Sequence, residues 1–591
     1  MKLKDILSPF YVWKRTFQKP YTVRKPIEEH RAADHYRGFH TNDIDKCIGC
    51  GSCSRICMNG SIDMVPAEGK ATTANDSGLR PRFDYGRCCW CALCVDICPT
   101  GSLAMSNDYL WVDTDPEQFR YTPGIDKKTW DDNPKGYKRD PGFKLLCYEQ
   151  VEMPMHDPSE GVKSFIEMVK GYSAEQANKE ADRCIECGIC VATCPGHMDI
   201  PGYIKAVREN RIEDGLRIIY ETNPMPAVCG RVCTHRCEFA CALSRTGEPV
   251  AIRWLKRYIA DQISPMDYGK ILQSRAPDTG KKIAIIGAGP GGLSAAYYLA
   301  LMGHAVTLYE RSPHAGGMLR YGIPEYRLPY NQLDKDIQRI AELGVDIRCN
   351  SEIGKDIPFD DLYNKNDVVF FSTGLSKPSS IRVDGEDHPR VIAGLSLLDA
   401  VTRGETPELG TDVAVIGGGN VAIDAARTAR RLGANVTIYY RRREVDMPAD
   451  DEEIHEAKLD GVTILTQAVP LAIEESDETS VVLVWGEAEM VEAGDGGRPK
   501  PVLREGSRNT AMVNTIIAAI GQEADYSFLP QEIVDRLEFK RGSVVTDDYG
   551  RTADPKIFAG GDIANKVRDA ISAIADGHRA ARGIDTFLGN G

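Results

Sequence analysis

The pattern of apolar and polar positions predicts helices in the middle of the chain and two strand–helix–strand units behind them. Apolar residues recur at three- and four-residue intervals across 173–184 and 200–226, which is the spacing of one helix face. Residues 281–312 and 412–443 each run through an apolar strand, a glycine turn, a helix and a second strand. We therefore expect a small helical domain followed by two α/β Rossmann-like dinucleotide-binding domains.

The first strand–helix–strand unit carries a dinucleotide-binding fingerprint. Gly287 permits the tight turn, Gly289 lets a pyrophosphate approach the backbone, and Gly292 lets the helix pack on the strand. The N-terminus of the helix faces the phosphates with its partial positive charge. Glu310, 23 positions after Gly287, is placed to accept hydrogen bonds from a ribose.

The second unit repeats the glycine turn, but its second strand ends without an acid. Tyr440 stands where an acid would favour an unmodified ribose, and three arginines follow it. Cations at this place suit a 2′-phosphate, so we expect NADP(H) rather than NAD(H), with at least one arginine facing solvent. The residues expected to contact this nucleotide are Gly417, Gly419, Asn420, Val421, Arg441 and Arg442.

The cysteines are concentrated in the front of the chain, in runs typical of iron–sulfur ligation. Of 19 cysteines, only Cys349 lies beyond residue 241. Two C-x2-C-x2-C-x3-C runs, 47–57 and 88–98, match the run of bacterial [4Fe–4S] ferredoxins, whose fourth cysteine closes the other cluster. Paired zinc knuckles, the alternative, would need C-x2-C pairs rather than quartets. The expected ligand sets are Cys47, Cys50, Cys53 and Cys98 for one cluster, and Cys88, Cys91, Cys94 and Cys57 for the other.

A second group of cysteines lies in the predicted helical region. The run Cys184, Cys187, Cys190 and Cys194 is followed 35 residues later by Cys229, Cys233, Cys237 and Cys241 at four-residue intervals. That interval is also the spacing of one helix face, so alone it does not separate ligands from a buried stripe. The helical surroundings predict an α-helical iron–sulfur domain over 151–278 rather than a βαβ ferredoxin.

The front segment resembles the ferredoxin-like subunit of respiratory complex I over roughly residues 10–110. In that family the segment lies against neighbouring subunits, which implies a partner-docking arm over 1–40 and an α+β 2[4Fe–4S] ferredoxin-like domain over 41–110. The arm has nine Lys/Arg against four Asp/Glu and carries Phe10, Tyr11, Trp13 and Phe17; a disordered basic tail is the alternative. Residues 111–150, with scattered Pro, Gly and Asp, are expected to be a linker.

From the third run onward the chain resembles the iron–sulfur flavoprotein family of the glutamate synthase small subunit. The same domain occurs at the N-terminus of dihydropyrimidine dehydrogenase and in the large subunit of ferredoxin:NADP transhydrogenase. The resemblance covers "EADRCIECGICVATCP", "NPMPAVCGRVCTHRCEFAC" and the remainder to residue 591. Clusters in that family are ligated crosswise, which implies Cys184, Cys187, Cys190 and Cys241 on one cluster and Cys194, Cys233 and Cys237 on the other.

The sequence does not identify the fourth ligand of the cluster expected on Cys194, Cys233 and Cys237. The family commonly supplies Glu or Gln from the following helix, whereas the matching residue here is Lys256. An ammonium group has no lone pair to offer iron. The alternatives are Cys229, Glu248, or a cluster that keeps an unusual site.

Two dinucleotide units in one chain also resemble flavoproteins in which an NAD(P)H domain is inserted into an FAD domain. The resemblance implies an FAD-binding domain over 279–402 and 523–591 and an NAD(P)H-binding domain over 403–522. The loop 316–329 matches the flavin-proximal loop of such proteins, 557–581 matches the closing segment, and 518–522 matches a strand end. The residues implied at the cofactors in these segments are Gly317, Leu319, Arg327, Gly521, Gly561 and Asp562.

Composition and charge exclude several classes of protein. A net charge of −14 argues against a general nucleic-acid binder. No apolar stretch approaches the roughly 18 to 20 residues of a membrane span. The N-terminus lacks the apolar core and cleavage site of a signal peptide, so we expect a cytoplasmic protein. No cysteine follows Cys349, so the pair that a thioredoxin-reductase-like enzyme needs beside its flavin is missing.

These features predict a flavin iron–sulfur electron-transfer subunit. NADPH gives up two electrons as a hydride, a cluster accepts one at a time, and a flavin converts between the two. We expect FAD and about four [4Fe–4S] clusters to connect NADP(H) with ferredoxin or a partner redox subunit docked near residues 1–110. Such subunits serve electron-bifurcating transhydrogenase, hydrogenase and formate dehydrogenase complexes. No catalytic acid or base is expected at the hydride step.

Two other functions fit parts of the sequence. One is the NADPH-oxidising small subunit of glutamate synthase, although that family normally lacks the front ferredoxin module. The other is a passive FAD and iron–sulfur assembly subunit without nucleotide chemistry, against which the intact second glycine turn argues.

Overall fold

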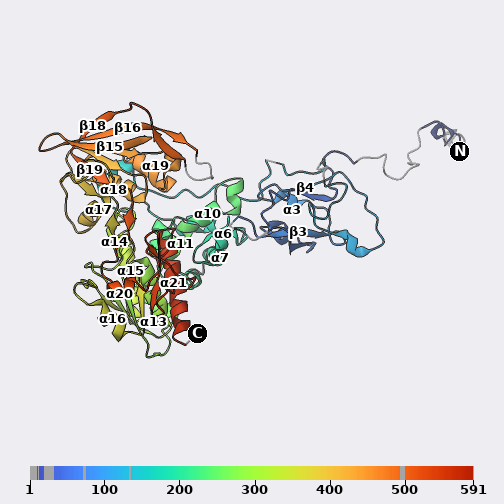
Figure 1. The fold of residues 1–591 in the computed structure, drawn as a ribbon. Helices are drawn as coiled ribbons and strands as arrows, with labels where there is room; N and C mark the ends of the chain where they lie inside the picture. The colour runs from blue at the N-terminus through green and yellow to red at the C-terminus, as the bar shows by residue number, and fades with distance from the viewer. Residues whose placement is uncertain are drawn as a thin grey trace. The chain divides into compact units, whose positions relative to one another are not determined.

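The computed structural model describes residues 10, 12–18, 32–70, 73, 75–131, 135–140, 142–492 and 499–589. These residues form two compact units, of which the first contains Met1–Glu149 and Ala240–Pro249. The second contains Gln150–Phe239 and Val250–Gly591 (Figure 1).

The first unit is an α+β domain built from two small antiparallel sheets. Strand β1 pairs with β4, and β2, β3 and β5 form the second sheet. A one-turn helix, α2 or α3, lies within each of the first two cysteine runs. The elements are β1 (His40–Asn42), α2 (Ser52–Ile56), β2 (Ile62–Pro66), β3 (Leu79–Asp84), α3 (Leu93–Asp96), β4 (Leu103–Met105), η1 (Pro116–Phe119), β5 (Arg120–Tyr121) and η2 (Ala242–Arg245).

Aromatic side chains from beyond residue 110 complete the core of this unit. Tyr121 is fully buried and Trp130 is 5% exposed, and the Trp130 ring stacks on Phe39 with centroids 4.4 Å apart. Trp111 packs on the same cluster. The expectation of a linker over 111–150 is therefore wrong for its first part, because these rings bury a large apolar area against the strands.

The predicted docking arm lies mostly outside the described residues, Tyr11 included. Phe10, Trp13 and Phe17 are exposed, at 67%, 68% and 90%. Exposed aromatic side chains of this size are typical of a surface that meets a partner. The docking role of the arm stays a prediction.

The second unit begins with a helical domain, as the three- and four-residue apolar spacing predicts. Helix α5 starts with a capping box, in which Ser173 and Gln176 satisfy each other's backbone N–H groups. Helices α9 and α11 cross closely at Gly230, where a Cβ atom would lie 2.6 Å from the Cα of Arg257. The elements are α4 (Pro158–Gly161), α5 (Ala174–Ala181), α6 (Ile189–Thr193), α7 (Ile200–Arg208), α8 (Ile212–Tyr220), α9 (Pro226–Val232), α10 (Arg236–Phe239), α11 (Ile252–Gln262), η3 (Pro265–Asp267) and α12 (Tyr268–Ile271).

A five-stranded parallel sheet follows, with the strand order β23-β9-β6-β7-β8. Strands β23, β9, β6 and β7 are largely buried on both faces, as expected of a parallel sheet covered by helices, whereas the edge strand β8 is exposed at Asp346 and Arg348. The elements are β6 (Lys282–Ile286), α13 (Pro290–Leu301), β7 (Ala305–Tyr309), α14 (Met318–Tyr321), α15 (Tyr330–Glu342), β8 (Asp346–Arg348), α16 (Phe359–Lys365), β9 (Val368–Phe371), β10 (Lys377–Pro378), β20 (Gln522–Glu523), α20 (Gln531–Val534), β21 (Phe539–Lys540), β22 (Ser543–Val544), β23 (Ile557–Ala559) and α21 (Ala570–Phe587).

A second five-stranded parallel sheet, β11-β19-β12-β13-β14, is inserted between β10 and β20. It begins at Val391, before the expected boundary at residue 403, and β15, β16, β17 and β18 form an antiparallel layer beside it (Figure 1). The elements are β11 (Val391–Ala393), α17 (Gly394–Thr402), β12 (Asp412–Ile416), α18 (Asn420–Arg431), β13 (Asn435–Tyr440), η4 (Glu444–Asp446), α19 (Asp451–Leu459), β14 (Thr463–Thr466), β15 (Ala468–Glu475), β16 (Val481–Val491), β17 (Lys500–Leu503), β18 (Asn509–Val513) and β19 (Thr515–Ala518).

Helix α21 is 18 residues long and packs along α13, the helix of the first glycine turn. Gly577 permits this contact, because a Cβ atom there would lie 2.3 Å from the carbonyl oxygen of Gly291. Across the described parts of the chain, no helix combines the length and the apolar character that a membrane crossing requires.

Candidate functional site

The three C-x2-C-x2-C loops share one backbone conformation. In each loop the residues two and four positions after the first cysteine have positive φ angles, a conformation that costs a non-glycine residue of order 1–3 kcal/mol. Three of these six positions are not glycine, so the loop keeps the same conformation even where a side chain makes it costly. The six residues are Gly49, Gly51, Trp90, Ala92, Glu186 and Gly188.

The first two runs exchange their fourth cysteines in space. Cys47, Cys50, Cys53 and Cys98 line one small cavity. In the other group, burial and then the charges of Cys88, Cys91 and Cys57 raise the pKa of Cys94. Thiols whose pKa is raised in this way ionise when a metal binds them, so both quartets suit a metal cluster.

One imidazole lies beside the second quartet. His40 Nε2 is 3.3 Å from Cys94 Sγ, and its Nδ1 is 3.0 Å from the hydroxyl oxygen of Tyr85. Burial lowers the pKa of His40 to about 3, so its ring is neutral and keeps one N–H to donate.

The helical domain gathers another set of buried cysteines. Cys194 ends α6, Cys233 ends α9, and Cys237 lies in α10, all of them buried. The pKa of Cys237 is raised by burial and by the charges of Cys233, Glu238 and Cys194, and lowered by that of Lys256. Cys229 is fully buried on α9.

The four cysteines expected to hold the other cluster of the helical domain are divided between the two units. Cys184, Cys187 and Cys190 lie in the second unit, whereas Cys241 lies in the short segment that groups with the first unit. The shared cluster expected of these four cysteines stays a prediction.

A cavity of about 750 Å³ lies between the two parallel sheets of the second unit. Its volume is within the range of sites for cofactors and other small molecules. The predicted residues that line it are Gly287, Gly289, Glu310, Gly317, Leu319, Arg327, Asn420, Val421, Gly561 and Asp562.

Close packing of backbone explains the glycines of this cavity. Gly287 has a φ of +100°, and a Cβ atom there would lie 2.5 Å from the carbonyl oxygen of Ser372. A Cβ atom on Gly317 would lie 2.8 Å from the Cα of Gly289, the residue that precedes α13. Gly289, Pro290 and Gly291 line the cavity, so the N-terminus of α13 faces it and would suit a phosphate group.

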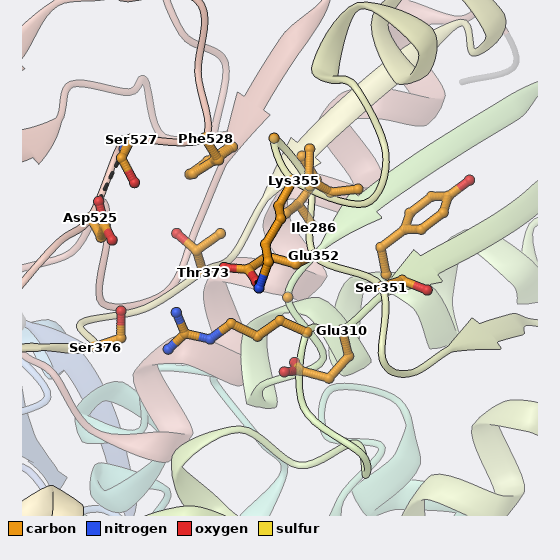
Figure 2. Close-up of a pocket in the computed structure, with 15 residues that line it drawn as sticks. Ile286, Glu310, Ser351, Glu352, Lys355, Thr373, Ser376, Asp525, Ser527 and Phe528 are labelled. Carbon is orange, nitrogen blue, oxygen red and sulfur yellow. Dashed lines mark hydrogen bonds and ion pairs between the residues drawn. The ribbon is translucent and has the colours of Figure 1, made fainter.

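Glu310 lies at the edge of the cavity, at the end of β7. Its carboxylate accepts hydrogen bonds from the N–H groups of Ala288 at 3.0 Å and Ser312 at 2.8 Å. Figure 2 shows Glu310 with Glu352 and Lys355 around a side pocket of about 190 Å³. The pocket therefore contains negative carboxylates and a positive ammonium group, which would suit a ribose and its neighbouring groups.

The start of α21 forms another part of the cavity wall. Asp569 caps this helix by accepting a hydrogen bond from Ser572 N–H at 2.8 Å. Burial, together with the charge of Asp569, raises the pKa of Asp562 to about 6. A carboxyl group with such a pKa can accept or donate a hydrogen bond near neutral pH.

The remaining predicted nucleotide residues lie outside this cavity, and two of them form the second glycine turn. Gly417 has a φ of +147°, and a Cβ atom there would lie 2.2 Å from the carbonyl oxygen of Ala519. Arg441 is exposed, and Arg442 Nε donates to the carbonyl oxygen of Pro499 at 3.1 Å. Arg443 is paired with Asp446 at 2.8 Å, which offsets part of its charge. The predicted residues outside the cavity are Gly292, Gly417, Gly419, Gly521, Arg441 and Arg442.

Sequence reasoning missed an acidic residue of the cavity. Asp424 lies one helical turn after Asn420 on α18, is buried, and receives two hydrogen bonds from Arg327 at 2.9 and 2.7 Å. The sequence could have indicated this residue, because Asp424 follows Asn420 by four positions and therefore lies on the same face of the helix. Arg403 and Asp399, also in the lining, follow no motif.

The helical domain also reaches the cavity. Val232 and Thr234, the neighbours of Cys233, both line it. The hydroxyl group of Thr234 donates to Asp569 at 3.1 Å, which ties this cysteine segment to the start of α21. The buried cysteine set and the large cavity are therefore adjacent.

Comparison with known proteins gives three family matches. Residues 281–577, half of the chain, match the pyridine nucleotide-disulphide oxidoreductase family. Residues 161–268 match domain II of dihydropyrimidine dehydrogenase, a 4Fe-4S cluster domain, and residues 46–102 match a 4Fe-4S dicluster domain.

Individual relatives extend these matches. The chain is 40% identical to the beta subunit of the NADP(+)-dependent formate dehydrogenase of Moorella thermoacetica, over 68% of this chain and 60% of the relative. It is 37% identical to the beta subunit of the NADPH-Fe(3+) oxidoreductase of Geobacter sulfurreducens, over 68% of this chain and 64% of the relative. It is 35% identical to the glutamate synthase [NADPH] small chain of Escherichia coli, over 76% of this chain and 98% of the relative. The chain thus spans less than two thirds of the first two relatives.

Proposed function

The chain belongs to the pyridine nucleotide-disulphide oxidoreductase family, and we propose that it moves electrons between NADP(H) and a partner redox subunit or ferredoxin. The route would run through FAD and about four [4Fe–4S] clusters. It is an NAD(P)H-dependent FAD and iron–sulfur oxidoreductase subunit, similar along most of its length to subunits named for NADPH chemistry.

The observation that carries the proposal is the contact between the cavity and the buried cysteines. Val232 and Thr234 line the cavity and flank Cys233. A ligand in the cavity and a cluster on Cys233 would therefore lie side by side, which short-range electron transfer requires. When bound, FAD would supply the exchange between two-electron hydride transfer and one-electron steps.

The residues of the cavity fit FAD. The open N-terminus of α13 suits the pyrophosphate, Glu310 suits the ribose of the adenosine, and Asp562 suits the ribityl chain. The start of α21 would face the flavin ring. Asn420 and Val421 on α18 would bring the nicotinamide end of NADPH to the same cavity, while Arg441 and Arg442 would bind the 2′-phosphate.

The cysteine groups fit four [4Fe–4S] clusters. The left-handed loop positions support a common cluster-binding shape in the first three runs. Two quartets in the first unit would hold two clusters, and the helical domain would hold two more, one of them on Cys194, Cys233 and Cys237. Cys241 would complete the ligand set of Cys184, Cys187 and Cys190.

The partner is proposed from charge and similarity. The relatives are named as subunits or chains of larger enzymes, including a formate dehydrogenase and a glutamate synthase. The dicluster match at 46–102 favours a chain that hands electrons to a redox partner at its front module over a glutamate synthase small chain. The basic, aromatic arm over 1–40 would dock that partner.

Iron analysis of the anaerobically purified chain tests the cluster count. Four cubes predict about 16 irons per chain, together with about one FAD. A value near 8 irons would overturn the four-cluster assignment. A preparation with FAD but without iron would overturn the whole route.

A further inference from the structure

Helix α11 places a lysine among the cysteines of the helical domain. Lys256 is only 4% exposed and belongs to the helix that crosses α9 at Gly230. Gly230 directly follows Cys229 in α9 and packs on the backbone of Arg257, the neighbour of Lys256. Burial lowers the pKa of Lys256, whereas the charges of Cys233, Cys229, Cys237 and Cys194 raise it, and the net shift is upward. Three of these cysteines are the expected ligands of one cluster, and Cys229 is one of the candidates for its fourth ligand.

The other cations of α11 are paired with carboxylates, and Lys256 is not. Arg253 pairs with Glu452, and Arg257 pairs with Glu167 at 3.0 Å and with Asp261 at 3.2 Å. Within the described ranges, no carboxylate lies within ion-pair distance of the Lys256 ammonium. Burying a cation without a counter-ion is costly, so an anion is required on the cysteine side.

The cysteine set beside Lys256 also adjoins the cavity. Cys233 lies between Val232 and Thr234, which line the cavity, and Arg236 pairs with Asp569 at the start of α21 at 3.1 Å. A cluster on Cys194, Cys233 and Cys237 would therefore be the first to receive an electron from the cavity. The charge next to it sets how readily it accepts that electron.

We propose that Lys256 is the counter-ion of the cluster held by Cys194, Cys233 and Cys237, and that its charge raises the reduction potential of this cluster. The inference rests on the proposed function. Reduction adds one negative charge to the cluster, and a fixed cation nearby stabilises the reduced state more than the oxidised state. Lys256 is thus a tuning residue that acts through the cluster, without touching the nucleotide.

Replacing Lys256→Met in the full-length chain tests the inference. The readout is an anaerobic potentiometric titration followed by electron paramagnetic resonance, with iron content measured on the same sample. We expect one cluster potential to fall so that its reduced-to-oxidised ratio at a fixed potential drops about tenfold, which equals about 59 mV for one electron. The other cluster potentials and the iron content should stay unchanged.

Two further variants control for packing and for net charge. Lys256→Arg keeps the cation and should keep the wild-type potential. Lys335→Met removes another lysine of the second unit, one that donates a hydrogen bond to the carbonyl oxygen of Ala260. Burial lowers the pKa of Lys335, and the charges that raise it are those of Asp336 and Asp261, not those of cysteines. It should leave every cluster potential in place.

The outcomes separate the inference from the proposed function. Unchanged potentials in Lys256→Met with full iron content would overturn the inference alone. Wild-type protein without iron–sulfur signals would overturn the proposed function. If Lys256→Met loses the iron of one cluster and Lys256→Arg retains it, the counter-ion role is supported, whereas equal loss in both would overturn it.

Discussion

The two nucleotide-binding domains share a backbone plan and differ in the charge that follows their second strand. Both have five parallel strands, four of which follow the same order, while the fifth edge strand is the last in the chain in one sheet and the first in the other. Both turn at a glycine with positive φ, Gly287 or Gly417. In both turns a Cβ atom would meet a carbonyl oxygen, at 2.5 Å from Ser372 or 2.2 Å from Ala519. The glycines are therefore required by packing against the neighbouring strand.

The difference begins at the end of the second strand. Strand β7 leads into Glu310, a buried carboxylate bonded to the backbone of its own glycine turn. Strand β13 ends at Tyr440, whose ring packs on Gly418, and exposed Arg441 follows. One site thus offers an anion, which would suit a ribose, and the other offers cations, which would suit a phosphate, on the same fold.

The largest expected effect comes from two separate variants, each of which adds a side chain at one of the two glycine turns. Gly287→Val should yield protein without bound FAD, because the added side chain would collide with Ser372. Gly417→Val should keep FAD but lose its reduction by NADPH, because only the second turn is blocked. The measurements are the flavin content and the bleaching of the flavin absorbance band by NADPH under anaerobic conditions.

A glycine in open space provides the control for this pair. Gly433 also has a positive φ, but no atom lies within 4 Å of the position of its Cβ. Gly433→Ala should therefore lose about 1–3 kcal/mol of stability through backbone strain, yet keep the FAD content and the NADPH bleaching of the wild type. Loss of FAD from the Gly417→Val protein would contradict the separate roles of the two turns.

A smaller effect is expected from the arginines after β13. Replacing both Arg441→Gln and Arg442→Gln should weaken NADPH binding about tenfold or more, because a charge-assisted hydrogen bond contributes roughly 1.5–3 kcal/mol. Binding of NADH, which lacks the 2′-phosphate, should hardly change. Dissociation constants for both nucleotides, measured on the same preparation, give the comparison.

Arg504 offers a matched control in the same domain. It is exposed and pairs with Glu487 at 2.8 Å, after strand β17. Arg504→Gln should leave both dissociation constants near their wild-type values. Equal weakening of NADPH and NADH in the double variant would show that the arginines support the domain and do not select the nucleotide.

The sequence predicted the features that depend on local chemistry. The glycine turn at Gly287, the helix after it and the acid at Glu310 are determined by spacing within about 25 residues, and the structure brings them to one cavity. The cysteine runs are equally local. The resemblance to known families supplied Asp562 and Arg327, which also line the cavity.

The features that the sequence did not predict depend on contacts between distant segments. Trp111 and Trp130 lie in a stretch rich in Pro and Asp, which by itself suggests a loop. They belong to the core because they pack on the cluster that contains Phe39. Strand β11 precedes the glycine turn of its own sheet and pairs with β19, more than 120 residues away in the sequence. Arg327 and Asp424 meet across 97 positions. No local period signals such contacts.

Anaerobic titration of the chain with NADPH tests the central claim most directly. The account predicts that about one equivalent bleaches the flavin band, and that further NADPH lowers the broad iron–sulfur absorbance, because electrons pass from the cavity to the cluster at Cys233. NADH at the same concentration should act more slowly. Flavin that stays oxidised in a chain holding both FAD and iron would contradict the account and favour a passive assembly subunit.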